Sequence, residues 1–477
     1  MTYLVNTLYI VAFGLFILGL SGLTGPKTAV RGNLIAAAGM TLAVVATLIK
    51  VRDTAPVNWI LIAAGLIIGV ALGMPPAKKT KMTAMPQLVA LFNGVGGGTV
   101  ALIAWAEFIE TDGFGHFAPD QSPTVALVIG SLFAAIIGSV SFWGSLVAFL
   151  KLQESIPKNL EKRLVKAARI FQASNAVLLL AAVAMAVYIG VHAGTGSPGW
   201  TIVVVLVLAG IVGLFVVFPI GGADMPVVIS LLNAMTGLSA AAAGLALNNT
   251  AMIVAGMIVG ASGSILTNLM AVAMNRSIPA IVFGSFGGGG DTAAAVAGDQ
   301  GTAKSTSAAD AAIQMAYANQ VIVVPGYGLA VAQAQHAVKD MASILESKGV
   351  EVKYAIHPVA GRMPGHMNVL LAEADVEYDA MKEMDDVNGE FGRTDVTLVI
   401  GANDVTNPAA RNDPSSPIHG MPILNVDQSR SVIVLKRSMS SGYAGIENPL
   451  FFLGHTSMLF GDAKKSVNAV TEELKAL

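Results

Sequence analysis

The sequence predicts a polytopic α-helical membrane bundle of about nine transmembrane helices, followed by an α/β domain with a doubly wound parallel sheet. Three observations support this fold class. The 477 residues are 54% hydrophobic and only 12% charged, whereas a soluble domain carries about 25% charged residues. Long apolar segments occupy the first part of the chain, and alternating strand and helix patterns begin at Gln320. This composition argues against a purely soluble enzyme and excludes a disordered chain.

The charges divide the chain near Arg276. Residues 1–276 hold 14 Lys and Arg against 8 Asp and Glu, a net charge of +6, whereas residues 277–477 hold 14 against 22, a net charge of −8. We therefore predict a membrane domain over residues 1–276 and a soluble domain over residues 310–477. Residues 277–309, rich in Gly, Ala and Ser, are predicted to form a flexible linker.

Several kinds of site are not expected in this chain. It contains no cysteine, which excludes disulfides, thiolate metal sites and cysteine nucleophiles. No metal-ligand spacing stands out, so no metal is expected. The net charge of −2 and the lack of a basic run give no sign of a nucleic-acid partner.

Nine apolar segments approach the length of about 20 residues that crosses a bilayer as a helix. The first has neither a basic start nor a small-residue cleavage site, so we expect a span rather than a signal peptide. Twelve Lys and Arg lie in the loops on one side, against Lys50 and Arg52 on the other. This bias predicts an N-terminus outside and a cytoplasmic C-terminal domain. The segments are 3–23, 33–49, 57–73, 86–106, 124–150, 170–190, 200–220, 226–247 and 251–275.

From Gln320 onward, short apolar segments rich in β-branched residues alternate with helix-period segments. A buried parallel strand has such a continuous apolar run, and the alternation favours a doubly wound sheet of the Rossmann type. A last helix is expected at 462–476. The predicted strands are 321–324, 351–357, 376–381, 395–400, 421–425 and 431–436.

The turn after the first of these strands contains Gly326, Gly328 and Ala330, which fit the G-x-G-x-x-G/A fingerprint only in part. A tight turn at a helix N-terminus lets the backbone approach a pyrophosphate. Glycine turns after strands are also common without any ligand. The turn alone therefore leaves nucleotide binding and a plain strand-to-helix turn both open.

Two further features bear on which dinucleotide binds. The second strand ends at His357 and Pro358 without the carboxylate that usually bonds the ribose 2′-OH of NAD. Lys436, Arg437 and Ser438 follow the last strand, where two cations and a hydroxyl can hold a 2′-phosphate. These three residues taken alone are also compatible with a solvated strand end. Together with the missing carboxylate they favour NADP.

Six segments are long enough to be specific: GGADMPVV at 221–228, GYGLAVAQAQ at 326–335, HPVAGRMPGHMNVLLAEA from 357, IGAND at 400–404, KRSM at 436–439 and GYAGIENPLFF at 442–452. They resemble the β subunit of the proton-translocating NAD(P) transhydrogenase, and the resemblance extends over nearly the whole chain. It implies a nine-helix proton channel in the inner (cytoplasmic) membrane, joined to a cytoplasmic NADP(H)-binding domain.

The resemblance also implies an activity and partners. Hydride would pass directly between NAD(H), bound by an alpha subunit, and NADP(H), bound by this chain, coupled to proton translocation across the membrane. NADPH formation would be driven by inward proton flow. The implied partners are the alpha subunit, in a dimer of alpha–beta units, and the lipid bilayer. Direct transfer explains why no acid–base pair stands out in the soluble domain, because the cofactors supply the chemistry.

Carried over residue by residue, the resemblance assigns the cofactor contacts to five groups of residues. The family holds NADP in a flipped orientation, so the glycine turn need not cradle a pyrophosphate in the standard way. The residues are Gly326, Tyr327, Gly328, Ala330, His357, Pro358, Val359, Ala360, Gly361, Arg362, Gly401, Ala402, Asn403, Asp404, Lys436, Arg437, Ser438, Tyr443 and Ala444.

Asp224 is the first candidate for the proton path, because an ionisable group in a membrane segment is costly and therefore a functional candidate. Its position before Met225 and Pro226 also suits a simple helix N-cap. The resemblance favours a role in proton gating at the cytoplasmic mouth. Asn233 lies on a small polar stripe of the same helix, which suits helix packing or, by the resemblance, a channel lining.

Asn93 marks a departure from the family. Some members have a channel histidine at this place, and this chain has no histidine in the middle of a predicted span. Asparagine cannot titrate, although it can orient a water or bond to a neighbouring helix. We therefore expect the titrating group to come from a helix of the alpha subunit.

An ion channel or transporter gated by a nucleotide-binding regulatory domain is the alternative function. It would share the layout of a membrane bundle followed by a Rossmann-type domain. Such a protein needs a filter of backbone carbonyls or charged rings. Residues 96–98, three glycines, are the only candidate, and they lack a known filter pattern.

Overall fold

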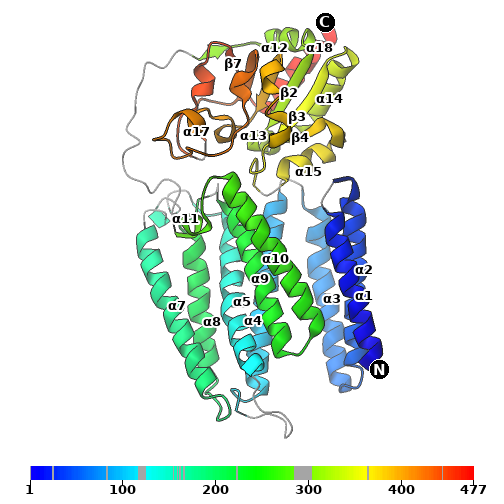
Figure 1. Cartoon of the computed structure of the whole chain (residues 1–477), viewed down its shortest axis with the longest axis vertical. Coiled ribbons are helices and arrows are strands. Elements are labelled where there is room, and N and C mark those ends of the chain that lie inside the picture. The colour runs from blue at the N-terminus through cyan, green and yellow to red at the C-terminus, as the bar shows by residue number, and fades with distance from the viewer. Residues whose placement is uncertain are drawn as a thin grey trace. The chain divides into compact units, whose positions relative to one another are not determined.

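A computed structural model describes residues 2–23, 26–81, 84–115, 125–153, 155–157, 160, 163–164, 167–221, 224–283, 303–362, 365–442 and 444–477. The chain divides into two compact units, both drawn in Figure 1. One comprises Met1–Pro219 and Ile229–Leu266, and the other comprises Ile220–Val228 and Thr267–Leu477.

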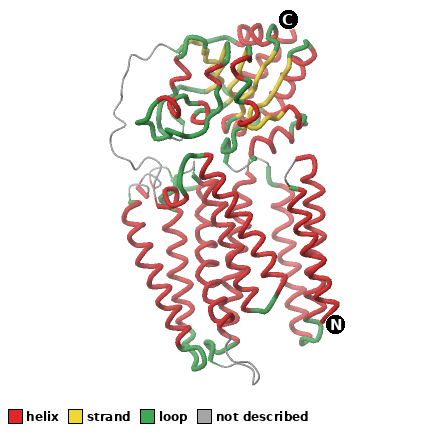
Figure 2. The backbone as a smooth tube through the Cα atoms, in the orientation of Figure 1, coloured by secondary structure: helices red, strands yellow, loops and turns green. Residues whose placement is uncertain are grey.

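Within the described residues, nine helices are long and apolar enough to cross a membrane, which confirms the predicted bundle (Figure 2). Pro56 and Pro86 stand in the first turns of two of them, where a missing N–H costs nothing. The helices are α1 (Thr2–Gly22), α2 (Pro26–Lys50), α3 (Pro56–Lys79), α4 (Met85–Glu110), α5 (Val125–Leu152), α7 (Ala168–Val191), α8 (Trp200–Val217), α9 (Met225–Ala246) and α10 (Thr250–Ala273).

Glycines let these helices approach each other closely. A Cβ at Gly138 of α5 would lie 2.7 Å from the carbonyl oxygen of Gly97 on α4. A Cβ at Gly19 of α1 would lie 2.8 Å from the Cβ of Ala36 and 2.9 Å from the carbonyl oxygen of Gly32 on α2. In a bilayer, where lipid is as apolar as the side chains, such close packing holds helices together.

The second unit contains a seven-stranded sheet in which every neighbouring pair of strands is parallel. The order is β1-β7-β6-β5-β2-β3-β4, so the chain winds outward from the central pair β2 and β5 in both directions. This confirms the doubly wound sheet. The strands are β1 (Lys304–Ser305), β2 (Gln320–Pro325), β3 (Glu351–Ile356), β4 (Met381–Glu383), β5 (Val396–Ile400), β6 (Ser431–Lys436) and β7 (Thr456–Phe460).

Helices and short turns cover the sheet. On one side α18 packs against α12 and α14, and Ser307 and Asp462 cap two of these helices by accepting main-chain N–H groups. On the other side Phe391 and Phe451 join the sheet core. The remaining elements are α11 (Ile278–Phe283), α12 (Ala308–Ala316), α13 (Tyr327–Ala332), α14 (Gln335–Ser347), α15 (His366–Glu373), η2 (Tyr378–Ala380), α16 (Met384–Val387), η3 (Phe391–Arg393), η4 (Asp404–Thr406), α17 (Ala409–Asn412), η5 (Val426–Gln428), η6 (Pro449–Phe452) and α18 (Ala463–Ala476).

The strand predictions need three corrections. Residues 421–425 form no strand: Pro422 has no N–H, and the N–H groups of Leu424 and Asn425 bond to loop groups instead of a ladder. The strand predicted at 376–381 begins as the 3-10 turn η2 and pairs only from Met381. Strands β1 and β7 were not predicted. Of the predicted linker 277–309, α11 and β1 are formed, and residues 284–302 lie outside the described residues.

The close contact of α1 with α2 gives a testable prediction. We expect Gly19→Val to lower the unfolding temperature of the purified chain in detergent, because overpacking costs about 1–3 kcal/mol. Gly14→Val, in the same helix, is the control, since within the described chain no atom outside the neighbouring backbone of α1 lies within 4 Å of its Cβ position. Equal unfolding temperatures for the two variants would contradict the packing described here.

Candidate functional site

A cavity of about 680 Å³ opens at the carboxyl edge of the sheet. Its lining includes Gly326 after β2, Gly401 after β5 and Leu435 at the end of β6. Strands β2 and β5 are neighbours, but their connections leave toward opposite edges of the sheet. This is the switch point at which doubly wound sheets bind ligands.

Two glycine turns meet at this point. A Cβ at Gly328 would lie 2.7 Å from the Cα of Gly401, and a Cβ at Gly326 would lie 2.5 Å from the Cα of Ala402. The N–H of Gly326 donates to Ile400 O (2.9 Å), and that of Gly328 donates to Gly401 O (3.0 Å). The glycines of the predicted fingerprint therefore allow the turns after β2 and β5 to touch, and two of their N–H groups are used within the chain.

The basic end of β6 forms one wall of the cavity. Lys436, Arg437 and Ser438 all line it. Burial lowers the pKa of the Lys436 ammonium, and the nearby Asp404 carboxylate opposes that shift. The ammonium donates to the carbonyl of Ser440 and lies 4.7 Å from the ring centre of Phe451. Lys436 is thus held in place, whereas Arg437 is exposed.

His357 and Arg362 do not line the cavity, but each contacts a segment that does. His357 is 1% exposed. Its Nδ1 accepts the N–H of Val359 (3.2 Å), so its Nε2–H donates to the carbonyl of Pro422 (2.8 Å). Burial lowers the pKa of His357 to about 4, against the opposing effect of the bond to Pro422. The Arg362 guanidinium lies 4.4 Å from the ring centre of Tyr327.

The structure brings most of the predicted cofactor residues together. Ala330 is buried in α13, His357 lies buried beside the wall, and Pro358 is exposed. Arg362 is not part of the lining, and Tyr443 lies outside the described residues. The predicted residues that line the cavity are Gly326, Tyr327, Gly328, Val359, Ala360, Gly361, Gly401, Ala402, Asn403, Asp404, Lys436, Arg437, Ser438 and Ala444.

Sequence reasoning missed part of the lining. Ile418 and Met421 belong to a small hydrophobic cluster with Ala410 and Ile423, against which Val359 packs. They come from a loop without any recognisable motif. Of the other missed residues, some belong to or adjoin segments that the sequence had singled out as specific and could have been found there; they are Val405, Leu435, Ser440, Ser441 and Gly442. Met274, Gly461 and Ala463 adjoin none of those segments.

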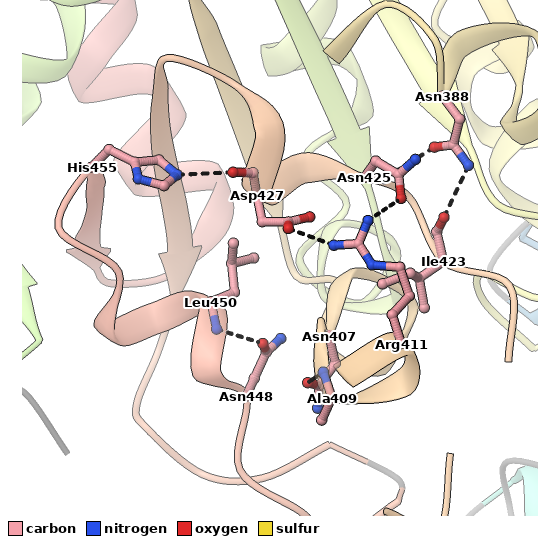
Figure 3. A network of polar contacts seen from close by, with 10 residues as sticks. All are labelled: Asn388, Asn407, Ala409, Arg411, Ile423, Asn425, Asp427, Asn448, Leu450 and His455. Carbon is pink, nitrogen blue, oxygen red and sulfur yellow. Dashed lines mark hydrogen bonds and ion pairs between the residues drawn. The ribbon is translucent and has the colours of Figure 1, made fainter. Parts of the chain in front are cut away.

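A polar network fastens this loop to α17 and to the chain directly after α16 (Figure 3). The Arg411 guanidinium donates to Asn425 Oδ1 (2.7 Å) and pairs with the Asp427 carboxylate. Asn388 Oδ1 accepts the N–H of Asn425 (3.0 Å), and Asn388 Nδ2 donates to the carbonyl of Ile423 (3.0 Å). The loop wall is therefore fixed by side chains rather than by a strand ladder.

In the membrane bundle, Asn93 belongs to a buried polar cluster. Its Nδ2 donates to Ser145 Oγ on α5 (2.9 Å) and lies 3.5 Å from Ser141 Oγ. Ser141 hydrogen bonds to Thr236 on α9. The side chain of α9 that joins the cluster is therefore Thr236, one turn from the predicted Asn233.

Asp224 lies at the start of α9 and has no solvent exposure. One of its carboxylate oxygens is 2.7 Å from Arg276 Nη1, and Arg276 Nη2 donates to the carbonyl of Ala280 (2.9 Å). The pair joins the N-terminus of α9 to the chain after α10. Among the described residues no group of three His, Asp or Glu is placed to hold a metal ion.

The comparisons with known proteins point in one direction. A family model described as NAD(P) transhydrogenase beta subunit matches residues 5–473. Two sequences named NAD(P) transhydrogenase subunit beta, from Rhodospirillum rubrum and from a defined strain of that species, are each 47% identical over 468 residues. Each match covers 98% of this chain and 98% of the relative.

The low pKa of His357 gives a prediction of pH dependence. Between pH 6.5 and about 4 the unfolded histidine binds a proton that the folded one does not, so the wild-type chain loses stability as the pH falls through this window. At pH 5 the part of this loss that is due to His357 is about 2 kcal/mol. We expect His357→Gln to show a smaller fall in unfolding temperature between pH 7.5 and pH 5. The same fall in both proteins would contradict this assignment.

Proposed function

The chain belongs to the family of NAD(P) transhydrogenase beta subunits, and from this membership we propose that it binds NADP(H) and transfers hydride to and from NAD(H) on a partner alpha subunit, coupled to proton translocation. It is a multi-pass membrane protein. The observation that carries the cofactor assignment is the cavity at the switch point between β2 and β5, with its basic wall at the end of β6.

The charges around the cavity support NADP(H) rather than NAD(H) on this chain. Strand β3 ends at Ile356 and is followed by His357, so no carboxylate is placed to bond a ribose 2′-OH there. The guanidinium of Arg437, the ammonium of Lys436 and the hydroxyl of Ser438 can hold a 2′-phosphate. When bound, NADP(H) supplies the hydride chemistry itself, and this chain's residues bind it and exclude water.

The glycine turns support the flipped orientation of the dinucleotide. A standard pyrophosphate cradle needs free N–H groups in the turn after the first strand. Here the N–H groups of Gly326 and Gly328 are bonded to Ile400 and Gly401. The turn therefore gives the dinucleotide a backbone surface to pack against, and these two N–H groups are not available to a pyrophosphate.

The polar groups of the bundle support a proton path. Asn93, Ser145, Ser141 and Thr236 form a line of side chains across α4, α5 and α9, which can orient protons and water but cannot titrate near neutral pH. The titrating group would come from the alpha subunit. Asp224, buried and paired with Arg276, is the gating residue at the cytoplasmic mouth, and Asn233 lies beside the path.

The remaining assignments follow from the family and the charge bias. The excess of Lys and Arg in the loops on one side supports a cytoplasmic C-terminal domain and an outward N-terminus in the inner membrane. Two alpha–beta units would make the complete enzyme, with NADPH formation driven by inward proton flow.

Membranes that contain both subunits should reduce an NADP analogue with NADH. We expect Arg437→Ala to raise the KM for NADP(H) roughly 10- to 100-fold, because a charge-assisted hydrogen bond to phosphate is lost. Arg430→Ala is the control: Arg430 precedes the opposite end of β6 and pairs with Asp395 (2.8 Å). Membranes that show no NADH-dependent reduction, or equal effects of the two variants, would contradict the proposed site.

The proposed gating role of Asp224 is tested by measuring proton pumping, because it should not affect NADP(H) binding. We expect Asp224→Asn in the assembled enzyme to abolish most proton pumping while NADP(H) still binds, since asparagine can neither titrate nor pair ionically with Arg276. Asp53→Asn removes a carboxylate from an exposed pair with Arg52 (3.4 Å) and should leave pumping intact. Wild-type pumping by Asp224→Asn would refute the gating role.

A further inference from the structure

Asn403 presents an unusual group to the cavity. It lines the cavity, and its side-chain Nδ2 is buried without a hydrogen-bond partner among the residues that the structure describes. A buried donor left unpaired costs about 1–3 kcal/mol. Such a group in a binding site is therefore poised to donate to a ligand.

The orientation of this amide is set by Asn448, which is 2% exposed. Asn448 Oδ1 accepts the main-chain N–H of Leu450 (3.0 Å), as drawn in Figure 3. Its Nδ2 donates to the main-chain carbonyl (3.1 Å) and to the side-chain Oδ1 (3.1 Å) of Asn403. Because a main-chain N–H only donates and a main-chain carbonyl only accepts, the amide of Asn448 has one possible orientation. Asn403 must then turn its Oδ1 toward Asn448 and its NH2 away.

The surroundings indicate what this NH2 binds. Asn403 Nδ2 lies 2.8 Å from the Cβ position of Gly442, and the two Asp404 carboxylate oxygens lie 2.5 and 2.7 Å from the same point. A phosphate at this place would be repelled by the carboxylate. A hydroxyl fits both neighbours, because it accepts from an amide and donates to a carboxylate.

We propose that Asn448 is a positioning residue for the cofactor site, which turns the Asn403 NH2 toward a ribose hydroxyl of the bound dinucleotide. This inference rests on the proposed binding of NADP(H) in the cavity. Asn448 itself does not line the cavity. It acts through Asn403, and its effect on affinity should therefore depend on the Asn403 side chain.

Asn407 provides a matched control. It is fully buried, its Oδ1 accepts the N–H of Ala409 (3.0 Å), and its Nδ2 donates to the carbonyl of Glu447 (3.1 Å). It thus caps a turn and, like Asn448, links the segment after β5 to the segment before η6. Unlike Asn448, it does not orient the Asn403 amide. A variant at Asn407 therefore shows how much stability and affinity are lost when only the link between the two segments is weakened.

The experiment measures NADPH dissociation constants and unfolding temperatures of the purified alpha–beta enzyme at pH 8. Asn448→Asp keeps the acceptor for Leu450 but replaces the donor facing Asn403 by an acceptor, so the Asn403 amide turns over. We expect Asn448→Asp to raise the Kd for NADPH about tenfold. Asn407→Asp should lower the unfolding temperature by a similar amount but change the Kd by no more than about twofold. Asn403→Ala should also raise Kd about tenfold, and adding Asn448→Asp to it should change Kd no further.

Four outcomes would overturn the inference. Equal losses of affinity in Asn448→Asp and Asn407→Asp, or additive losses in the double variant, would mean that Asn448 acts only on the fold. A loss seen with NADPH but not with its thionicotinamide analogue would assign the contact to the carboxamide instead of a hydroxyl. Wild-type enzyme that binds no NADPH would overturn the proposed function together with this inference.

Discussion

The unit that contains the sheet depends on a contact between two backbone turns at positions without side chains. The turns after β2 and β5 touch at Gly326, Gly328 and Gly401, where a side chain on either turn would collide with the other. Gly401 also has a φ of +67°, which glycine adopts at little cost. This contact holds the ends of the two central strands together and brings Asn403 and Asp404 into the same cavity wall as Tyr327.

The sequence specified the architecture well because its signals are local. Each apolar segment and each β-branched strand can be recognised from a few consecutive residues. Lys436 and Arg437 can be recognised because they directly follow a strand. The missed features depend on distant contacts. Ile418 and Met421 carry no motif, and they lie in a loop that distant residues, Arg411 and Asn388, hold in place. Residues 421–425 resemble a strand in composition, but Pro422 and bonds to loop groups keep them out of the sheet.

In the membrane unit, too, single residues could be selected from local sequence, whereas their contacts with other helices could not. Asn93 could be selected from the sequence because it departs from a family pattern, and Asp224 because acids are rare in apolar segments. Their partners could not be predicted. The hydroxyl that reaches the Asn93 cluster from α9 belongs to Thr236, not Asn233, since helix rotation decides which side of a polar stripe faces the neighbour. Ser141 and Ser145 look like ordinary small packing residues until their partners are known.

The pairing of β1 with β7 has a consequence for the order of synthesis. Lys304 is in register with Ser457, and the Lys304 ammonium donates to the carbonyl of Gly454 (2.6 Å). Strand β1 therefore cannot pair until β7, the last strand of the sheet, has left the ribosome. The membrane helices are made earlier and can already insert. Such long-range closure slows folding. A chain that stops before residue 456 would lack β7, so β6 would become an open sheet edge, which is prone to pair with another chain.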